Sequence, residues 1–145
     1  MFTERVRSVM ERKKLLIASP ETTVVGAAKL MAKRKVGAVM VVDDDRKLIG
    51  MFTERDVIMR VIAEGRDVQT TQLGEVMTTL PQSVDPDKSF GYALLLMHEN
   101  GFRHVPVVEH GKVIGIVSAR DALDPKMEEL LVESERRKKI LRERA

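Results

Sequence analysis

The stretch that decides the fold runs from Lys47 to Ile58 and reads KLIGMFTERDVI, and it returns at residues 112–123 as KVIGIVSARDAL. Upstream, residues 20–43 align with residues 86–109 without a gap at a shift of 66, and seven of these twenty-four positions are identical. One residue is then deleted in the second copy, so residues 47–58 align with residues 112–123 at a shift of 65. The chain is therefore a degenerate internal duplication. The literal MFTER at residues 1–5 also occurs at 51–55, but its surroundings differ, so we interpret it as chance.

Each copy shows the same order of predicted elements. Thr23 and Ser89 are N-cap residue types, and they precede helical patterns that run to about Lys35 and Gly101. Two β-rich runs joined by a short polar turn follow, which predicts a hairpin, and a second helix comes after it. The runs are 38–42 and 48–52 in the first copy and 105–108 and 113–117 in the second; the second helices span about 54–64 and begin at 119; short extended stretches at 15–18 and 83–84 lead into the copies.

The predicted fold class is therefore α/β, of the α+β kind, with two pseudo-symmetric repeats that each hold a small sheet and two helices. We place the first repeat at residues 6–65, the second at 73–124 and a C-terminal helical extension at 125–145. A unit of about sixty residues buries little surface alone, so the repeats are expected to share a core. Their equivalent loops are then expected on opposite sides of one cleft, as two matching sites.

Composition narrows the function classes. The 145 residues are 43% hydrophobic and 32% charged, without an apolar run near eighteen residues or a signal-like start, so we expect a soluble protein, no membrane partner and a cytoplasmic location. There is no cysteine, which excludes disulfides and thiolate chemistry. Residues 125–145 hold seven Lys or Arg and five Asp or Glu, so +2 of the net charge of +3 lies there and a nucleic-acid groove on the body is not indicated.

The duplicated motif itself reads GMFTERD at 50–56 and GIVSARD at 115–121, and each copy also carries a V-x-V-V strand. This pattern, twice at the matching place of a duplicated unit, resembles the cystathionine-β-synthase-type (CBS) domain, here as a stand-alone tandem pair. The resemblance implies a regulatory module, not an enzyme, that binds AMP, ADP, ATP, NAD(H) or S-adenosylmethionine and acts on another, unknown protein in energy sensing. It also implies a homodimer formed through helices.

Thr53 and Ser118 lie between a strand and a helix in the predicted order, and Asp56 and Asp121 follow three residues later. Hydroxyls and free N–H groups at a helix start suit phosphate, and a carboxylate one turn later can accept the two hydroxyls of a ribose. The resemblance assigns Ser/Thr to phosphate and Asp to ribose in the same way. The alternative is a capping box, in which the carboxylate binds the backbone of its own helix start. An empty site is compatible with both.

The resemblance also implies that each site borrows from the other repeat. It completes the Ser118/Asp121 site with Lys14, Leu15 and Leu16 and with Val36, Gly37 and Ala38, whose small side chains would let a ligand approach the backbone. It completes the Thr53/Asp56 site with Thr78, Phe102, Arg103 and His104. Arg103, near the shared axis, is expected to reach either ligand, whereas His104 is alternatively a partly buried core histidine. Arg55 and Arg120 either touch phosphate or face solvent.

Other features indicate no further chemistry. Asp43–Asp45 lacks the glycine and the distal glutamate of a calcium loop, so we interpret it as a hairpin turn and propose no metal. No nucleophile–base pair or cluster of histidine ligands is evident. The tail predicts a solvated or dimer-bracing helix with Met127, Leu130, Leu131, Ile140 and Leu141 on one side. The alternative function is a ligand-independent interaction adaptor, or a nucleic-acid binder that uses this charged helix.

Overall fold

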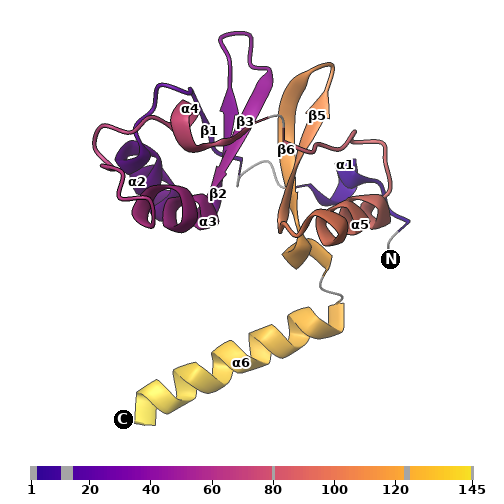
Figure 1. Ribbon diagram of the computed structural model, residues 1–145. Coiled ribbons are helices and arrows are strands. Elements are labelled where there is room, and N and C mark those ends of the chain that lie inside the picture. The colour runs from indigo at the N-terminus through magenta and orange to yellow at the C-terminus, as the bar shows by residue number, and fades with distance from the viewer. Residues whose placement is uncertain (1–2, 11–14, 80, 123–124, 145) are drawn as a thin grey trace.

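The computed structural model describes residues 3–10, 15–79, 81–122 and 125–144. It shows two lobes whose sheets lie side by side at the centre, with helices on the outside and one long helix leading away from the body (Figure 1). This is the predicted mixed α/β architecture of two repeats and a C-terminal helix. Within the described residues, no helix is both long enough and apolar enough to cross a bilayer.

The first lobe contains a four-stranded sheet in the order β1-β2-β3-β4, in which β1 and β2 are parallel and the other pairs antiparallel. Its elements are β1 (Ile17–Ala18), α2 (Val24–Arg34), β2 (Ala38–Val42), β3 (Leu48–Thr53), α3 (Glu54–Asp56), the π-helical η1 (Val57–Ile62), α4 (Leu73–Val76) and β4 (Thr78–Thr79).

The second lobe is built on the antiparallel hairpin of β5 and β6, and Val84 forms a parallel bridge to Val107 beside it. Its elements are α1 (Val6–Val9), α5 (Phe90–Asn100), β5 (His104–Glu109), β6 (Lys112–Ser118) and the 3-10 turn η2 (Ala119–Ala122); α6 (Pro125–Arg144) follows. One expectation was wrong here. Ala119 begins only a 3-10 turn, whereas its counterpart Glu54 begins a helix that continues through η1.

The first helices of the two repeats are capped alike, which confirms the predicted helix starts and ends. Thr23 Oγ1 accepts a hydrogen bond from Gly26 N at 3.2 Å, and Ser89 Oγ accepts one from Tyr92 N at 3.1 Å. Both helices end on a left-handed residue, Lys35 with φ 56° and Gly101 with φ 70°. The chain therefore leaves α2 and α5 in the same direction, and β2 and β5 begin at equivalent positions of the two lobes.

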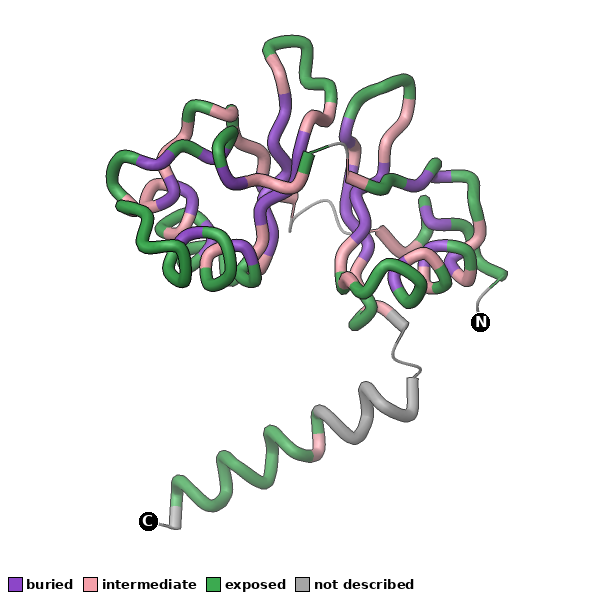
Figure 2. Tube along the Cα trace, viewed as in Figure 1, coloured by how far each residue is buried: buried purple, intermediate pink, exposed green. Residues whose placement is uncertain are grey.

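The core has three parts, and the third one joins the lobes. Each lobe has a cluster between its sheet and its helices, around Phe52 in the first and Phe90 in the second. The inter-lobe cluster contains Met40 and Met51 from the first lobe together with Val113 and Ile116 from the second. Strand alternation produces this split, because β2 is buried on both faces. Figure 2 shows the buried strands at the centre of the molecule and the exposed C-terminal part of α6.

The repeats exchange their leading segments. Helix α1, at the start of the chain, packs on the second lobe: Val6 lies in that lobe's core, and its N–H donates to Lys88 O at 2.8 Å. Conversely, α4 and β4 pack on the first lobe, where Leu73 lies in the core and donates from its N–H to Thr22 O at 2.8 Å. In the sequence-based division, residues 6–9 stood in the first repeat and 73–79 in the second. The structure places each against the other repeat.

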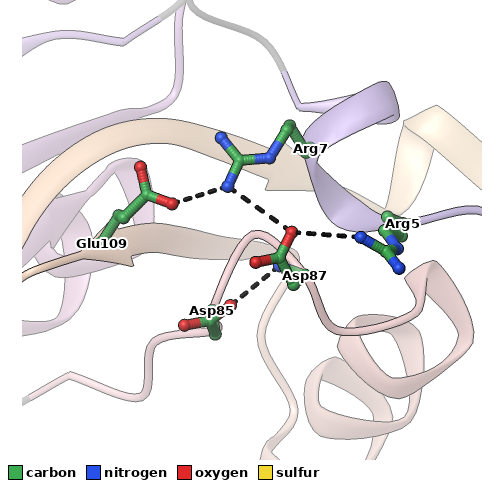
Figure 3. Close-up of polar contacts among 5 residues, drawn as sticks. All are labelled: Arg5, Arg7, Asp85, Asp87 and Glu109. Carbon is green, nitrogen blue, oxygen red and sulfur yellow. Dashed lines mark hydrogen bonds and ion pairs between the residues drawn. The ribbon is translucent and has the colours of Figure 1, made fainter.

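Ion pairs fasten the exchanged N-terminal segment to the second lobe (Figure 3). A guanidinium nitrogen of Arg7 donates to Glu109 Oε2 at 2.6 Å, and the same nitrogen lies 3.5 Å from Asp87 Oδ1. Arg5 approaches the same Asp87 oxygen at 3.6 Å. Asp87 is itself held in its turn, because its N–H donates to Asp85 Oδ1 at 2.8 Å. These side chains are largely exposed, so they orient α1 more than they stabilise it.

Candidate ligand-binding site

Two cavities lie where the lobes meet, and each combines the Ser/Thr-x-x-Asp turn of one repeat with the turn before the first hairpin strand of the other. The first cavity has a volume of about 280 Å³ and is lined by residues 35–38 of the first lobe and by Ile116 and residues 118–121 of the second. Gly37 and Ala38 are thus brought to Ser118 and Asp121, as the resemblance implied.

The second cavity, of about 680 Å³, is built from the pseudo-symmetric counterparts. It is lined by residues 101–104 of the second lobe and by Met51 and residues 53–56 of the first. Thr78 joins them from β4, because it pairs with Met51 of β3. Two cavities from equivalent residues are what a duplicated unit with a shared core is expected to make.

The acidic residue of each motif is tied to its own helix start. Thr53 N–H donates to Asp56 Oδ2 at 2.9 Å, and Ser118 N–H donates to Asp121 Oδ2 at 2.9 Å. Asp56 is only 8% exposed, and its other oxygen lies 3.5 Å from Arg60 Nε. The capping interpretation therefore describes one oxygen of each carboxylate. For Asp121, no hydrogen bond involves Oδ1 within the described residues.

The two cavities differ where their turns meet. Glu54 N–H donates to Gly37 O at 3.1 Å, and at the equivalent place Ala119 N–H donates to Arg103 O at 2.9 Å. The first lobe therefore places Gly37 beside the acidic Glu54. The second lobe places the basic Arg103 beside Ala119. A Cβ on Gly37 would lie 3.0 Å from Glu54 Oε1, so the missing side chain leaves the room that the Glu54 carboxylate fills.

His104 lines both cavities and is half-buried at the start of β5. Burial lowers its pKa below the ordinary histidine value; the carboxylates of Glu54 and Asp121 oppose this effect, and Arg103 adds to it. The imidazole is therefore held more strongly in its neutral form than in water, in which one ring nitrogen donates and the other accepts.

Some predicted residues lie elsewhere. Leu16 does not line either cavity: it is 3% exposed in the core of the first lobe, because alternation along this stretch turns Leu15 toward the inter-lobe cluster and Leu16 the other way. This placement corrects its assignment. Lys14 lies outside the described residues. Arg120 lines the first cavity, as Arg55 lines the second. Asp43 forms a turn, accepting hydrogen bonds from Asp45 and Lys47 N–H groups at 2.9 and 2.8 Å.

Sequence reasoning missed other residues that line the cavities. Lys35 lines the first cavity and Arg60 the second, while Glu54 lines both. Signals for two of them were present, because Lys35 is the counterpart of Gly101 at a shift of 66, and Arg60 follows Asp56 by four residues. Glu54 stands inside the motif itself, where its counterpart is Ala119.

A family model for the CBS domain matches the chain twice, at residues 6–63 and 73–127. The chain belongs to the CBS domain family. Among curated relatives, the CBS domain-containing protein YhcV of Bacillus subtilis is 41% identical over 103 residues, which cover 71% of this chain and 72% of YhcV. The chain spans only between 18% and 22% of longer relatives from Schizosaccharomyces pombe and Arabidopsis thaliana.

Solved structures show the same CBS-pair fold. An uncharacterised conserved protein from Pyrococcus horikoshii has a TM-score of 0.77 at 29% identity, with 94% of this chain and 95% of that chain covered. The CBS domain pair of MJ0100, solved in complex with 5′-methylthioadenosine and S-adenosyl-L-methionine, has a TM-score of 0.73 at 24% identity, with 81% of this chain and 95% of that chain covered. At that identity the likeness concerns the fold.

Proposed function

We propose that this CBS pair is a regulatory module, not an enzyme, that binds an adenosine-containing ligand in its two cavities and transmits the binding to a partner protein. The observation that carries the proposal is the pseudo-symmetric pairing of each Ser/Thr-x-x-Asp turn with the opposite repeat's pre-strand turn around a cavity. The candidate ligands are AMP, ADP, ATP, NAD(H) and S-adenosylmethionine.

The residues of the first cavity suit such a ligand. Asp121 offers a carboxylate oxygen for ribose hydroxyls, and the Ser118 hydroxyl offers a donor. Ile116 supplies an apolar surface for a base, while Lys35 and Arg120 supply charge for phosphate. The cavity volumes of about 280 and 680 Å³ are of the order found for small-molecule sites.

A thermal-shift series with AMP, ADP, ATP, NADH and S-adenosylmethionine tests the proposal. A ligand that binds only the folded chain stabilises it by about 2.7 kcal/mol at a hundredfold excess over Kd, so at least one ligand is expected to raise Tm by several degrees. Unchanged Tm values with all five at millimolar concentration contradict the proposal.

Two kinds of variant locate the binding. Asp56→Asn and Asp121→Asn together are expected to abolish the ligand-induced rise, while the loss of two capping carboxylates lowers the Tm of the free chain. Arg103→Ala changes an exposed side chain that forms no ion pair with the described residues, so it separates binding from stability. It is expected to reduce the rise for phosphorylated ligands and leave the Tm of the free chain within a degree or two.

The exposed C-terminal helix is the one feature that favours the alternative, an adaptor or nucleic-acid binder. Among the described side chains 132–143 all but Glu133 are exposed, and residues 136–139 read RRKK. Deletion of residues 126–145 decides between the two. In our proposal the deletion leaves adenosine-ligand binding intact; the alternative predicts salt-sensitive binding to RNA or DNA that the deletion abolishes. We place the module in the cytoplasm, as a homodimer.

A further inference from the structure

The two cavities share one wall. Gly37, Glu54, Arg103 and His104 line both of them, so these residues face ligands from two sides. Each cavity also has private charges: Lys35, Arg120 and Asp121 in the first, and Arg55, Arg60 and Asp56 in the second. Of the cations that line only the second cavity, Arg60 is already in an ion pair with Asp56.

Each charged side chain of the wall comes from one repeat and has no charged counterpart in the other repeat. Arg103 is its only guanidinium and Glu54 its only carboxylate, since their counterparts at the pseudo-symmetric positions are Gly37 and Ala119. Within the described residues, neither Arg103 nor Glu54 has an ion-pair partner within 4.0 Å. Both side chains are exposed, so each is free to turn toward either cavity.

An anionic group that enters one cavity draws Arg103 toward itself and repels Glu54. Because Glu54 lines both cavities, turning away from the first anion brings its carboxylate toward the second cavity. A second anion then meets an unneutralised carboxylate, and Arg103 is already engaged. The phosphates also repel each other across a wall that carries no net charge when His104 is neutral.

From this geometry, which rests on the proposed function, we propose that the wall of Glu54 and Arg103 makes the two cavities select unlike ligands. A phosphorylated adenosine ligand in one cavity weakens the binding of a second phosphorylated ligand in the other. The other cavity then favours an adenosine derivative that carries no phosphate. Glu54 is the specificity-determining residue of this arrangement, and Arg103 is the cation over which the two ligands compete.

Calorimetric titration of the full chain with AMP tests the first statement. We expect one AMP per chain to bind tightly and the second at least tenfold more weakly, a ratio typical of coupling between sites. With adenosine added to the AMP complex, native mass spectrometry is expected to show one AMP and one adenosine per chain. Two AMP sites of equal affinity, or an adenosine that enters only by displacing AMP, overturn the proposal.

Two substitutions test the residues. Glu54→Gln removes the carboxylate and keeps its shape, so the second AMP is expected to gain at least fivefold in affinity and the first to gain less. Arg103→Ala is expected to weaken the tight AMP at least tenfold and to change adenosine binding less than threefold. The matched control is Glu64→Gln, an exposed glutamate outside both cavities, which is expected to leave both AMP affinities unchanged.

The outcomes separate the two proposals. If Glu54→Gln tightens both AMP molecules equally, the gap reflects unequal cavities rather than a shared carboxylate, and the inference fails while the proposed function stands. If neither AMP nor adenosine binds the wild-type chain, the inference fails, and the thermal-shift series with all five ligands decides whether the proposed function stands.

Discussion

At the scale of residues, His104 is one of the positions where the two repeats differ. Its counterpart is Ala38, which is 2% exposed under the first cavity, whereas His104 takes an ionisable ring into the same position of the second repeat. The sequence could indicate only that a histidine precedes a core strand. The pKa of this histidine depends on its burial and on neighbouring charges, and only the folded structure shows these.

The lowered pKa of His104 predicts a dependence of stability on pH. The unfolded chain takes up the proton at about pH 6.5, and the folded chain only at lower pH. Stability is therefore complete above pH 6.5 and falls as pH drops below it. Urea unfolding between pH 7.5 and 5.5 measures this: His104→Gln is expected to lose less stability over that range than the wild type, and the exposed control His98→Gln to lose as much as the wild type. Equal losses in all three contradict the assignment.

The glycine that opens each motif is required by a methionine of the exchanged segment. A Cβ on Gly115 would lie 2.9 Å from Met10 Sδ and 3.2 Å from its Cγ, and Met77 stands over Gly50 in the same way. Gly115→Ala is expected to destabilise the chain by about 1–3 kcal/mol through overpacking, as measured by urea unfolding.

The stability of the double variant identifies the cause of that loss. Adding Met10→Ala to Gly115→Ala makes room for the new methyl group, so the combined loss is expected to be smaller than the sum of the two single losses. Additive losses would place the strain elsewhere.

At the scale of elements, much of the fold follows from local signals. The N-caps Thr23 and Ser89 and the polar turns between the β-rich runs predicted α2, α5 and both hairpins, because caps and strand periodicity act within a few residues. The exchange of α1 and α4 was not predicted. Its signal is weak, VRSVM at 6–10 against LGEVM at 73–77 with a shift of 67, and its partners lie some eighty residues away, as in Arg7 with Asp87.

The end of α2 offers a test of element geometry. Lys35 adopts φ 56°, where its counterpart is a glycine, and an L side chain is strained in that region. Lys35→Gly is expected to raise the free energy of unfolding by about 1 kcal/mol, measured by urea denaturation. As the control, Lys33→Gly inside α2 is expected to lower it by about 1 kcal/mol. Destabilisation by both would show that the Lys35 side chain contributes more than its backbone costs.

At the scale of the whole molecule, both lobes leave apolar side chains exposed on their outer helices. On η1, Ile58 and Ile62 are 61% and 60% exposed, and on α5 Leu95 is 53% exposed. We propose that these side chains form the interface of the homodimer, because contiguous exposed apolar groups mark association surfaces.

The dimer prediction is tested by Ile62→Lys with Leu95→Lys. Burying two charges at such an interface costs several kcal/mol, so the double variant is expected to sediment as a monomer where the wild type sediments as a dimer. Gln69→Lys, at an exposed polar position, is the control for added charge and is expected to remain dimeric. A dimer that survives the double substitution would place the interface on another surface.

We propose that the two cavities between the repeats hold adenosine ligands through Asp56 and Asp121. A crystal structure of the chain grown with millimolar AMP tests this most directly. We expect a ribose whose hydroxyls donate to the Asp121 or Asp56 carboxylate, with the base against Ile116 or Met51. AMP bound on another surface, or both cavities filled only with solvent, would contradict it.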